Sequence, residues 1–165
     1  ALRLPAPAVA AVAVLAAVAH AWRLALWQPW ATRRTPLVWV LLLAYAWIPL
    51  HLALRAWALL GGPVTASTAT HALTVGAIGA LTLGMMTRTA RGHTARPLKA
   101  DRWDVASYAL VAAAAVVRVP MGALWPAAYV EGLLASALLW TAALVIYAVR
   151  YAPSLWRPRL DGRPG

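Results

Sequence analysis

The sequence predicts an all-α fold, a polytopic bundle of about five transmembrane helices. Hydrophobic residues make up 63% of the chain and charged residues only 12%, and the mean hydropathy is +0.69. Soluble domains carry roughly twice that charged fraction. Apolar stretches long enough to cross a bilayer fill most of the 165 residues, and too little polar surface remains to cover them in water. A soluble bundle is therefore the disfavoured alternative.

The predicted spans follow in order along a single transmembrane domain, 1–165. The first ends in AWRLALWQPW, which is typical of a helix leaving the membrane at headgroup level. No small-residue cleavage pattern follows it, so we interpret it as an internal span and not as a signal peptide. A basic cytoplasmic loop over 88–103 separates the third span from the fourth, and a cytoplasmic tail over 150–165 ends the chain. The spans are about 5–22, 36–60, 67–87, 104–122 and 126–149.

The formal net charge of +11 is distributed unevenly between the connections. The second and fourth connections hold almost no basic residues, which is the positive-inside pattern of a protein with an odd number of spans. This pattern predicts an N-terminus outside and a C-terminus in the cytoplasm. It argues against nucleic acid as a partner and favours anionic lipid headgroups. The basic residues of the first connection, the third connection and the tail are Arg23, Arg33, Arg34, then Arg88, Arg91, Arg96, Lys99, Arg102, then Arg150, Arg157, Arg159 and Arg163.

The chain contains no cysteine, and this narrows the metal chemistry. Disulfides, thiolate metal sites, iron–sulfur clusters and covalent CxxCH haem attachment are excluded within this segment. Haem would have to be held noncovalently, by histidine, and copper would need His or Met ligands. Phosphate-binding loops, dinucleotide fingerprints, HExxH and GxSxG motifs do not occur.

Small residues recur every four positions along the third span and form a stripe on one helix face. Such a stripe favours close helix packing, with a groove for a flat macrocycle as the alternative. Trp47 and Trp140 lie deep inside predicted spans and require a packed site, whereas most of the ten tryptophans lie near the interfaces. The stripe consists of Ala72, Gly76, Ala80 and Gly84.

Histidines are the candidate ligands. His71 is predicted about one turn inside the outer end of the third span and His51 in the outer half of the second, which makes a candidate outer pair. His20 and His93 make a candidate inner pair. An imidazole can ligate iron or copper through one nitrogen while a hydrogen bond fixes the other. The alternative is a histidine bonded to a neighbouring helix, but the cost of an ionisable group in a bilayer makes His71 the first candidate.

Two further polar residues flank the fourth connection. Arg118 either extends to the outer headgroups or pairs with Glu131 or with a haem propionate. Glu131 is the only acid predicted inside a span and the one candidate there for carrying protons. Met85, at the end of the third span, offers a soft thioether that suits Cu(I), although such residues usually serve packing.

Three segments resemble the NnrS family of bacterial polytopic membrane proteins. THALTVGAIGALTLGMMTRTARGHTARPL is similar to the family pattern of a histidine, spaced glycines, a Met-x-x-Arg turn and GHTGRPL. TPLVWVLLLAYAWIPL is similar to its Pro-Leu-x-Trp segment, and RYAPSLWRPRLDGRPG to its C-terminal signature. Two positions depart from the pattern: Ala95 replaces the second glycine of GHTGRPL, and Leu42 stands where many members have a histidine.

The resemblance implies a multi-pass protein of the bacterial inner membrane that contains haem, b-type-like, and copper. It implies a role in nitric-oxide response linked to denitrification, with nitric oxide as a ligand. It also implies that the chain is the C-terminal portion of a longer protein, which agrees with a start at Ala1 outside the membrane and a missing N-terminal transmembrane portion. The family positions that carry over are His71, His93, Arg88 and Arg118 for cofactor binding, and His71, His93 and Met85 for metal.

The resulting hypothesis is a haem-binding membrane protein in which His71 ligates the iron. Two alternatives stay open. One is a haem–copper redox enzyme acting on nitric oxide, for which no catalytic residue is assigned. The other is a transporter or channel without haem, in which the histidines handle protons or ions.

Overall fold

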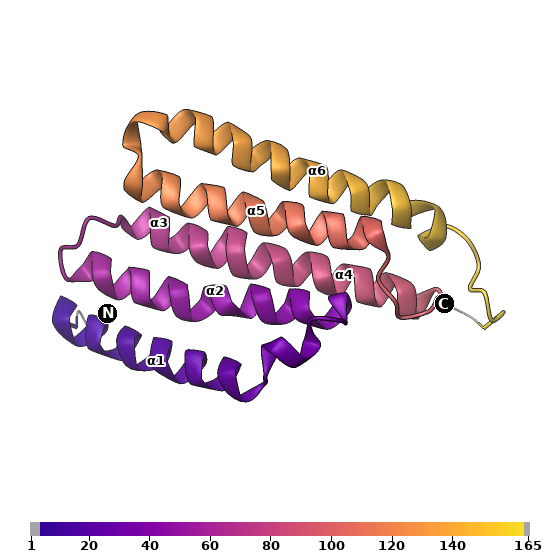
Figure 1. Ribbon diagram of the computed structural model, residues 1–165, viewed down its shortest axis with the longest axis horizontal. Helices are drawn as coiled ribbons and strands as arrows, with labels where there is room; N and C mark the ends of the chain where they lie inside the picture. The colour runs from indigo at the N-terminus through magenta and orange to yellow at the C-terminus, as the bar shows by residue number, and fades with distance from the viewer. Residues whose placement is uncertain (1–3, 164–165) are drawn as a thin grey trace.

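Five long helices follow one another in antiparallel order through the computed structural model, which describes residues 4–163 apart from the side chains of 122, 123 and 126 (Figure 1). The start of the predicted domain, 1–3, and the end of the predicted tail, 164–165, lie outside the described residues. No strand occurs in the described part of the chain. The helices are α1 (Ala6–Leu26), α2 (Pro36–Leu59), α3 (Ala66–His71), α4 (Ala80–His93), α5 (Arg102–Leu124) and α6 (Tyr129–Leu155).

The third long helix is continuous but not uniform. A π-helical segment, η2 (Ala72–Gly79), joins α3 to α4 without a break, and short 3₁₀ turns, η1 (Pro29–Thr32) and η3 (Pro126–Ala128), precede α2 and α6. Five helical stretches are long and apolar enough to cross a membrane, which confirms the all-α class and the prediction of about five helices of this kind. The π-helix was not predicted; such segments are rare.

The helices form a layer in chain order, from α1 at one edge to α6 at the other (Figure 1). The continuous helix from α3 to α4 lies between α2 and α5, and α6 also reaches back to α4. The largest cluster of buried apolar residues joins α2, α4, α5 and α6. The two ends of the layer differ in charge. The connections 27–35 and 94–101 and the segment after α6 lie at one end, called the basic end below. The uncharged connections 60–65 and 125–128 lie at the other, called the neutral end.

Local sequence sets the helix ends. Pro36 occupies the first turn of α2, where its missing N–H costs nothing. The hydroxyl of Thr65 accepts a hydrogen bond from the Thr68 N–H, 3.1 Å away, and begins α3. Asp101 and Asp104 form a reciprocal capping box at the start of α5.

The small-residue stripe serves helix packing and is not an open groove. Its four members are buried, and a Cβ added at Gly76 would overlap the ring of Trp47 on α2. A Cβ at Gly84 would come 2.9 Å from Val40 on the same helix. Trp140 of α6 lies in the same way against Gly79, so both deep tryptophans have the packed site that the sequence demanded.

The predicted basic loop over 88–103 is shorter in the structure. Helix α4 continues to His93 and α5 begins at Arg102, so the loop is 94–101. The helix persists because Arg91 on its last turn is held by partners on α5 and α6, and the chain turns only at Ala95, which has a φ of 57°. The predicted tail is helical as far as Leu155.

Candidate functional site

The first candidate site lies at the neutral end, where α3, α5 and α6 meet. His71 is the last residue of α3, directly before the π-helical segment. Its Nε2 lies 2.8 Å from Nη2 of Arg118 on α5. The same Nη2 donates to the hydroxyl of Tyr129, the first residue of α6, at 3.1 Å. The structure thus brings together two of the predicted site residues, His71 and Arg118, and adds Tyr129, which the sequence did not single out.

A cavity of about 280 Å³ adjoins this cluster. Its wall combines His71 and Arg118 with apolar side chains, and Ser136 turns its hydroxyl to the Ala114 carbonyl at 2.9 Å. One short polar edge on an otherwise apolar cavity is the usual form of a small-molecule site. The apolar part of the wall comes from Val75, Leu133, Ala137 and Trp140.

Arg118 carries a charge that no acid of the chain balances. It is only 9% exposed, although a buried cation is costly unless it is paired. The four acids of the sequence all lie in the described part of the chain; three of them pair with other arginines, and none pairs with Arg118. The predicted pair of Arg118 with Glu131 is therefore wrong. Glu131 lies two residues after Tyr129, on the opposite face of α6, and is exposed.

The hydrogen bonds also decide which histidine has a free lone pair. A guanidinium only donates, so Nε2 of His71 must accept and Nδ1 must carry the hydrogen. His71 in this arrangement has no lone pair left for a metal. His51 differs: its Nδ1 lies 2.7 Å from the Ala69 carbonyl, which only accepts, so Nδ1 is the donor and Nε2 keeps its lone pair. A carbonyl on one imidazole nitrogen is the usual support of a metal-ligating histidine.

The other predicted site residues lie apart from this cluster. His93 ends α4 at the basic end, about 30 Å along the helix from His71. Arg88 and Met85 are exposed on α4, and Met85 is about 20 Å along the helix from His71. The three predicted metal ligands therefore cannot hold one ion together. No group of three His, Cys, Asp or Glu suited to a metal occurs among the described residues.

Neither predicted histidine pair forms a site. His51 bonds to the Ala69 carbonyl and not to His71. His20 lies 2.5 Å from the Tyr45 hydroxyl through its Nδ1, between α1 and α2. Both therefore join neighbouring helices, which is the alternative that the sequence left open.

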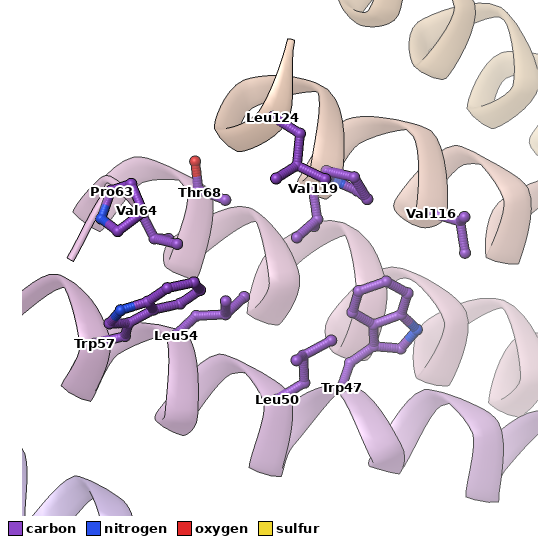
Figure 2. A pocket seen from close by; sticks show the side chains of 11 residues that line it. Trp47, Leu50, Leu54, Trp57, Pro63, Val64, Thr68, Val116, Val119 and Leu124 are labelled. Carbon is purple, nitrogen blue, oxygen red and sulfur yellow. The ribbon is translucent and has the colours of Figure 1, made fainter.

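An apolar cavity of about 390 Å³ lies beside α2, α3 and α5 at the neutral end (Figure 2). Trp47 and Trp57 of α2 form its two ends, and Val119 and Leu124 of α5 face them. Apart from the Thr68 hydroxyl and the indole N–H groups of Trp47 and Trp57 its lining is apolar, and it carries no charged side chain. It suits lipid chains better than a reaction.

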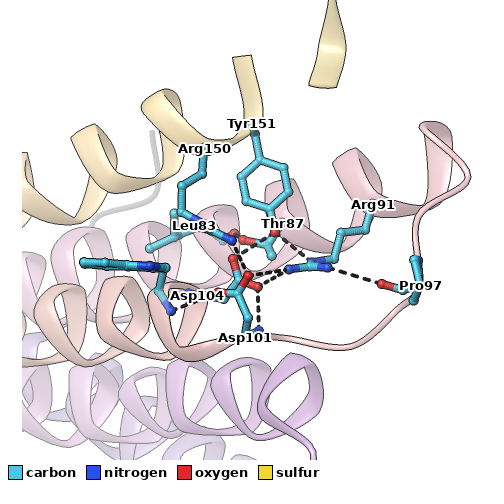
Figure 3. A network of polar contacts seen from close by, with 9 residues as sticks. Leu83, Thr87, Arg91, Pro97, Asp101, Asp104, Arg150 and Tyr151 are labelled. Atoms are coloured by element: carbon cyan, nitrogen blue, oxygen red, sulfur yellow. Dashed lines mark hydrogen bonds and ion pairs between the residues drawn. The ribbon is translucent and has the colours of Figure 1, made fainter. Parts of the chain in front are cut away.

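A second polar cluster closes the basic end, and the sequence did not predict it (Figure 3). Nη2 of Arg91 donates to Asp104 at 2.6 Å, and Nε donates to the Tyr151 hydroxyl at 2.8 Å. That hydroxyl donates in turn to Asp104 at 2.8 Å, which closes a triangle between α4, α5 and α6. Arg150 pairs with the neighbouring Asp101.

Asp101 itself titrates below its ordinary range. Partial burial acts to raise its pKa, but hydrogen bonds from the Asp104 and Trp103 N–H groups, together with the charges of Arg150 and Arg91, outweigh burial and lower it. The carboxylate is therefore stabilised in its charged form. The cluster holds three helix ends together.

The fold and the neutral-end cluster define a class: a polytopic helical protein of membrane type with an arginine and a histidine paired inside its apolar layer. The family model described as NnrS protein matches residues 1–159, and the chain belongs to the NnrS family. No curated protein and no solved structure matches the chain.

Proposed function

We propose that this NnrS-family protein binds haem noncovalently within the bilayer and acts in the bacterial response to nitric oxide. The observation that carries the proposal is the pair of His71 and Arg118 on an intramembrane cavity. Haem requires an imidazole for iron, an apolar wall for the macrocycle and cations for its propionates. An imidazole, an apolar wall and one such cation, Arg118, occur side by side at the neutral end.

The residues fit this group, with one condition. His71 can ligate iron through Nε2 only when Arg118 has moved from that nitrogen to another acceptor, and a propionate is such an acceptor. His51 meets the condition already, since its Nε2 is free, and it is the second candidate ligand. When bound, haem would supply an iron with an open position for nitric oxide; the protein sets the axial ligand, the burial and the nearby donors.

The distribution of charge supports a defined orientation. Both basic connections and the segment after α6 lie at the same end of the layer, and by the positive-inside rule that end would face the cytoplasm in a bacterial inner membrane. The cluster of His71 and Arg118 then lies near the outer surface. Arg88 and His93, which are exposed at the basic end, face anionic headgroups in this arrangement.

Copper binding is also part of the proposal, and fewer observations support it than support haem binding. Met85 is 46% exposed and lies on α4 without a histidine beside it in the sequence. Any copper would therefore need ligands from more than this helix or from a partner. Metal analysis decides this point directly.

The test is an absorption spectrum of the purified protein in detergent, oxidised, then reduced with dithionite, then exposed to nitric oxide, with metal analysis on the same sample. We expect a Soret band that shifts with nitric oxide and is lost in His71→Ala. If His51→Ala loses the band and His71→Ala keeps it, His51 is the ligand. Loss in His93→Ala alone moves the site to the basic end. A colourless protein, despite haem supplied during expression, refutes the proposal in favour of a transporter.

A further inference from the structure

We propose that Arg118 anchors a binding site for a planar monovalent oxyanion, a carboxylate or an ion of similar shape such as nitrate. The inference goes beyond haem binding, because it starts from the buried charge of Arg118 and its lack of a counter-ion within the chain. Arg118 and Asp104 are the two buried charged residues of the described chain. Asp104 has the counter-ion Arg91 at 2.6 Å, and Arg118 has none. A buried cation without a counter-ion calls for an anion from outside the chain.

The contacts that hold Arg118 are all to neutral groups. His71 and Tyr129 accept from Nη2, and the guanidinium carbon lies 5.2 Å from the centre of the Tyr129 ring. These contacts fix the side chain and give some cation–π attraction, but they do not balance its charge. Among the described residues no acceptor is bound to Nε or Nη1 of Arg118, so donors remain for a ligand.

The cavity beside Arg118 has the size and the character for such an ion. Its volume is about 280 Å³, whereas one water takes about 30 Å³ in the liquid. Its other walls are mostly apolar, so the attraction between an ion there and the guanidinium is stronger than it would be in bulk water. A divalent, strongly hydrated ion would lose too much hydration there, which favours a single charge.

Two sources could supply this chemistry, a haem propionate or a free oxyanion. The probe is sodium formate, with sodium nitrate in parallel, at constant ionic strength held by a bulky sulfonate. The readout is the thermal unfolding midpoint of the purified, haem-free protein in detergent. We expect a saturable rise in wild type and the same rise in Arg55→Gln, a matched loss of one exposed arginine near the same end. Arg118→Gln should weaken the apparent affinity by about 10- to 100-fold, as expected for a charge-assisted hydrogen bond.

Arg118→Lys keeps the charge and guards against a variant that fails to fold; we expect it to respond, but more weakly than wild type, because lysine lacks the planar fork. The proposal is overturned if wild type does not respond, or if Arg118→Gln responds like wild type. Repeating the titration on haem-loaded protein separates the two sources. If the response is lost with haem and returns with the dimethyl ester of haem, the propionate is the occupant. If the response is unchanged, the occupant is a free oxyanion. A protein that takes up no haem but still responds to formate through Arg118 would refute the haem proposal alone.

Discussion

Replacement of Asp104 by Asn should be the most destabilising single polar change at the basic end. Asp104 is 3% exposed and accepts from Arg91, from the Tyr151 hydroxyl and from the Asp101 N–H. Removing one partner of a buried ion pair costs about 3–5 kcal/mol, because the other charge stays buried. Asp101 lies 3.3 Å from Arg91 and is 40% exposed, so it remains as a weaker counter-ion for Arg91. We therefore expect a loss of about 3 kcal/mol in the free energy of unfolding, at the lower limit of that range.

The assay is the free energy of unfolding by SDS titration in mixed micelles. Asp161→Asn is the matched control, because it removes an aspartate from an exposed pair with Arg159 and should cause no measurable change. The double variant Arg91→Met with Asp104→Leu should recover part of the loss, since it removes both charges together but leaves the buried Tyr151 hydroxyl without its two partners. Equal stability of Asp104→Asn and Asp161→Asn would show that the triangle of Arg91, Asp104 and Tyr151 does not hold the helices.

Two further changes test other parts of the fold. Gly76→Ala places a methyl group against the Trp47 ring and should cost about 1–3 kcal/mol by the same titration; Gly92→Ala, whose Cβ meets nothing within 4 Å, should be neutral or stabilising, and a reversed order would contradict the packing of the stripe. Because the pKa of Asp101 is lowered in the folded protein, its contribution is complete above the unfolded value of 3.8 and is lost as pH falls through the lower folded value. Stability should therefore fall below about pH 4, and less steeply in Asp101→Asn; identical profiles would exclude Asp101 as a source.

The helices and the packing stripe could be predicted because they depend on local sequence. Twenty apolar residues in a row indicate a span whatever lies beside it, and a spacing of four small residues indicates one helix face. The residues that Gly76 and Gly84 meet, Trp47 and Val40, could not be predicted, because they belong to another helix. For the same reason the end of α4 was predicted too early. Arg91 was assigned to a basic loop, because its partners Asp104 and Tyr151 belong to other helices and could not be known from the local sequence.

The candidate site shows the same limit in its charges. His71 was selected for the cost of its burial and Arg118 for its match to the family pattern, and the distance of 2.8 Å between them is a property of how α3 packs on α5. The pairing of Arg118 with Glu131 followed from the short connection between them, but two residues along a helix reverse the direction of a side chain. Tyr129 therefore meets Arg118, and Glu131 does not.

The two ends of the layer use buried charge in opposite ways. At the basic end, Asp104 has a cation and three hydrogen bonds, all from the chain itself. At the neutral end, Arg118 has two neutral acceptors and a cavity beside it. A buried cation without a counter-ion in the chain destabilises the folded protein. An anion that binds to it only in the folded state therefore raises the free energy of unfolding. Variants at Asp104 should thus lower stability with or without ligand, whereas variants at Arg118 should change mainly the stability that an oxyanion adds.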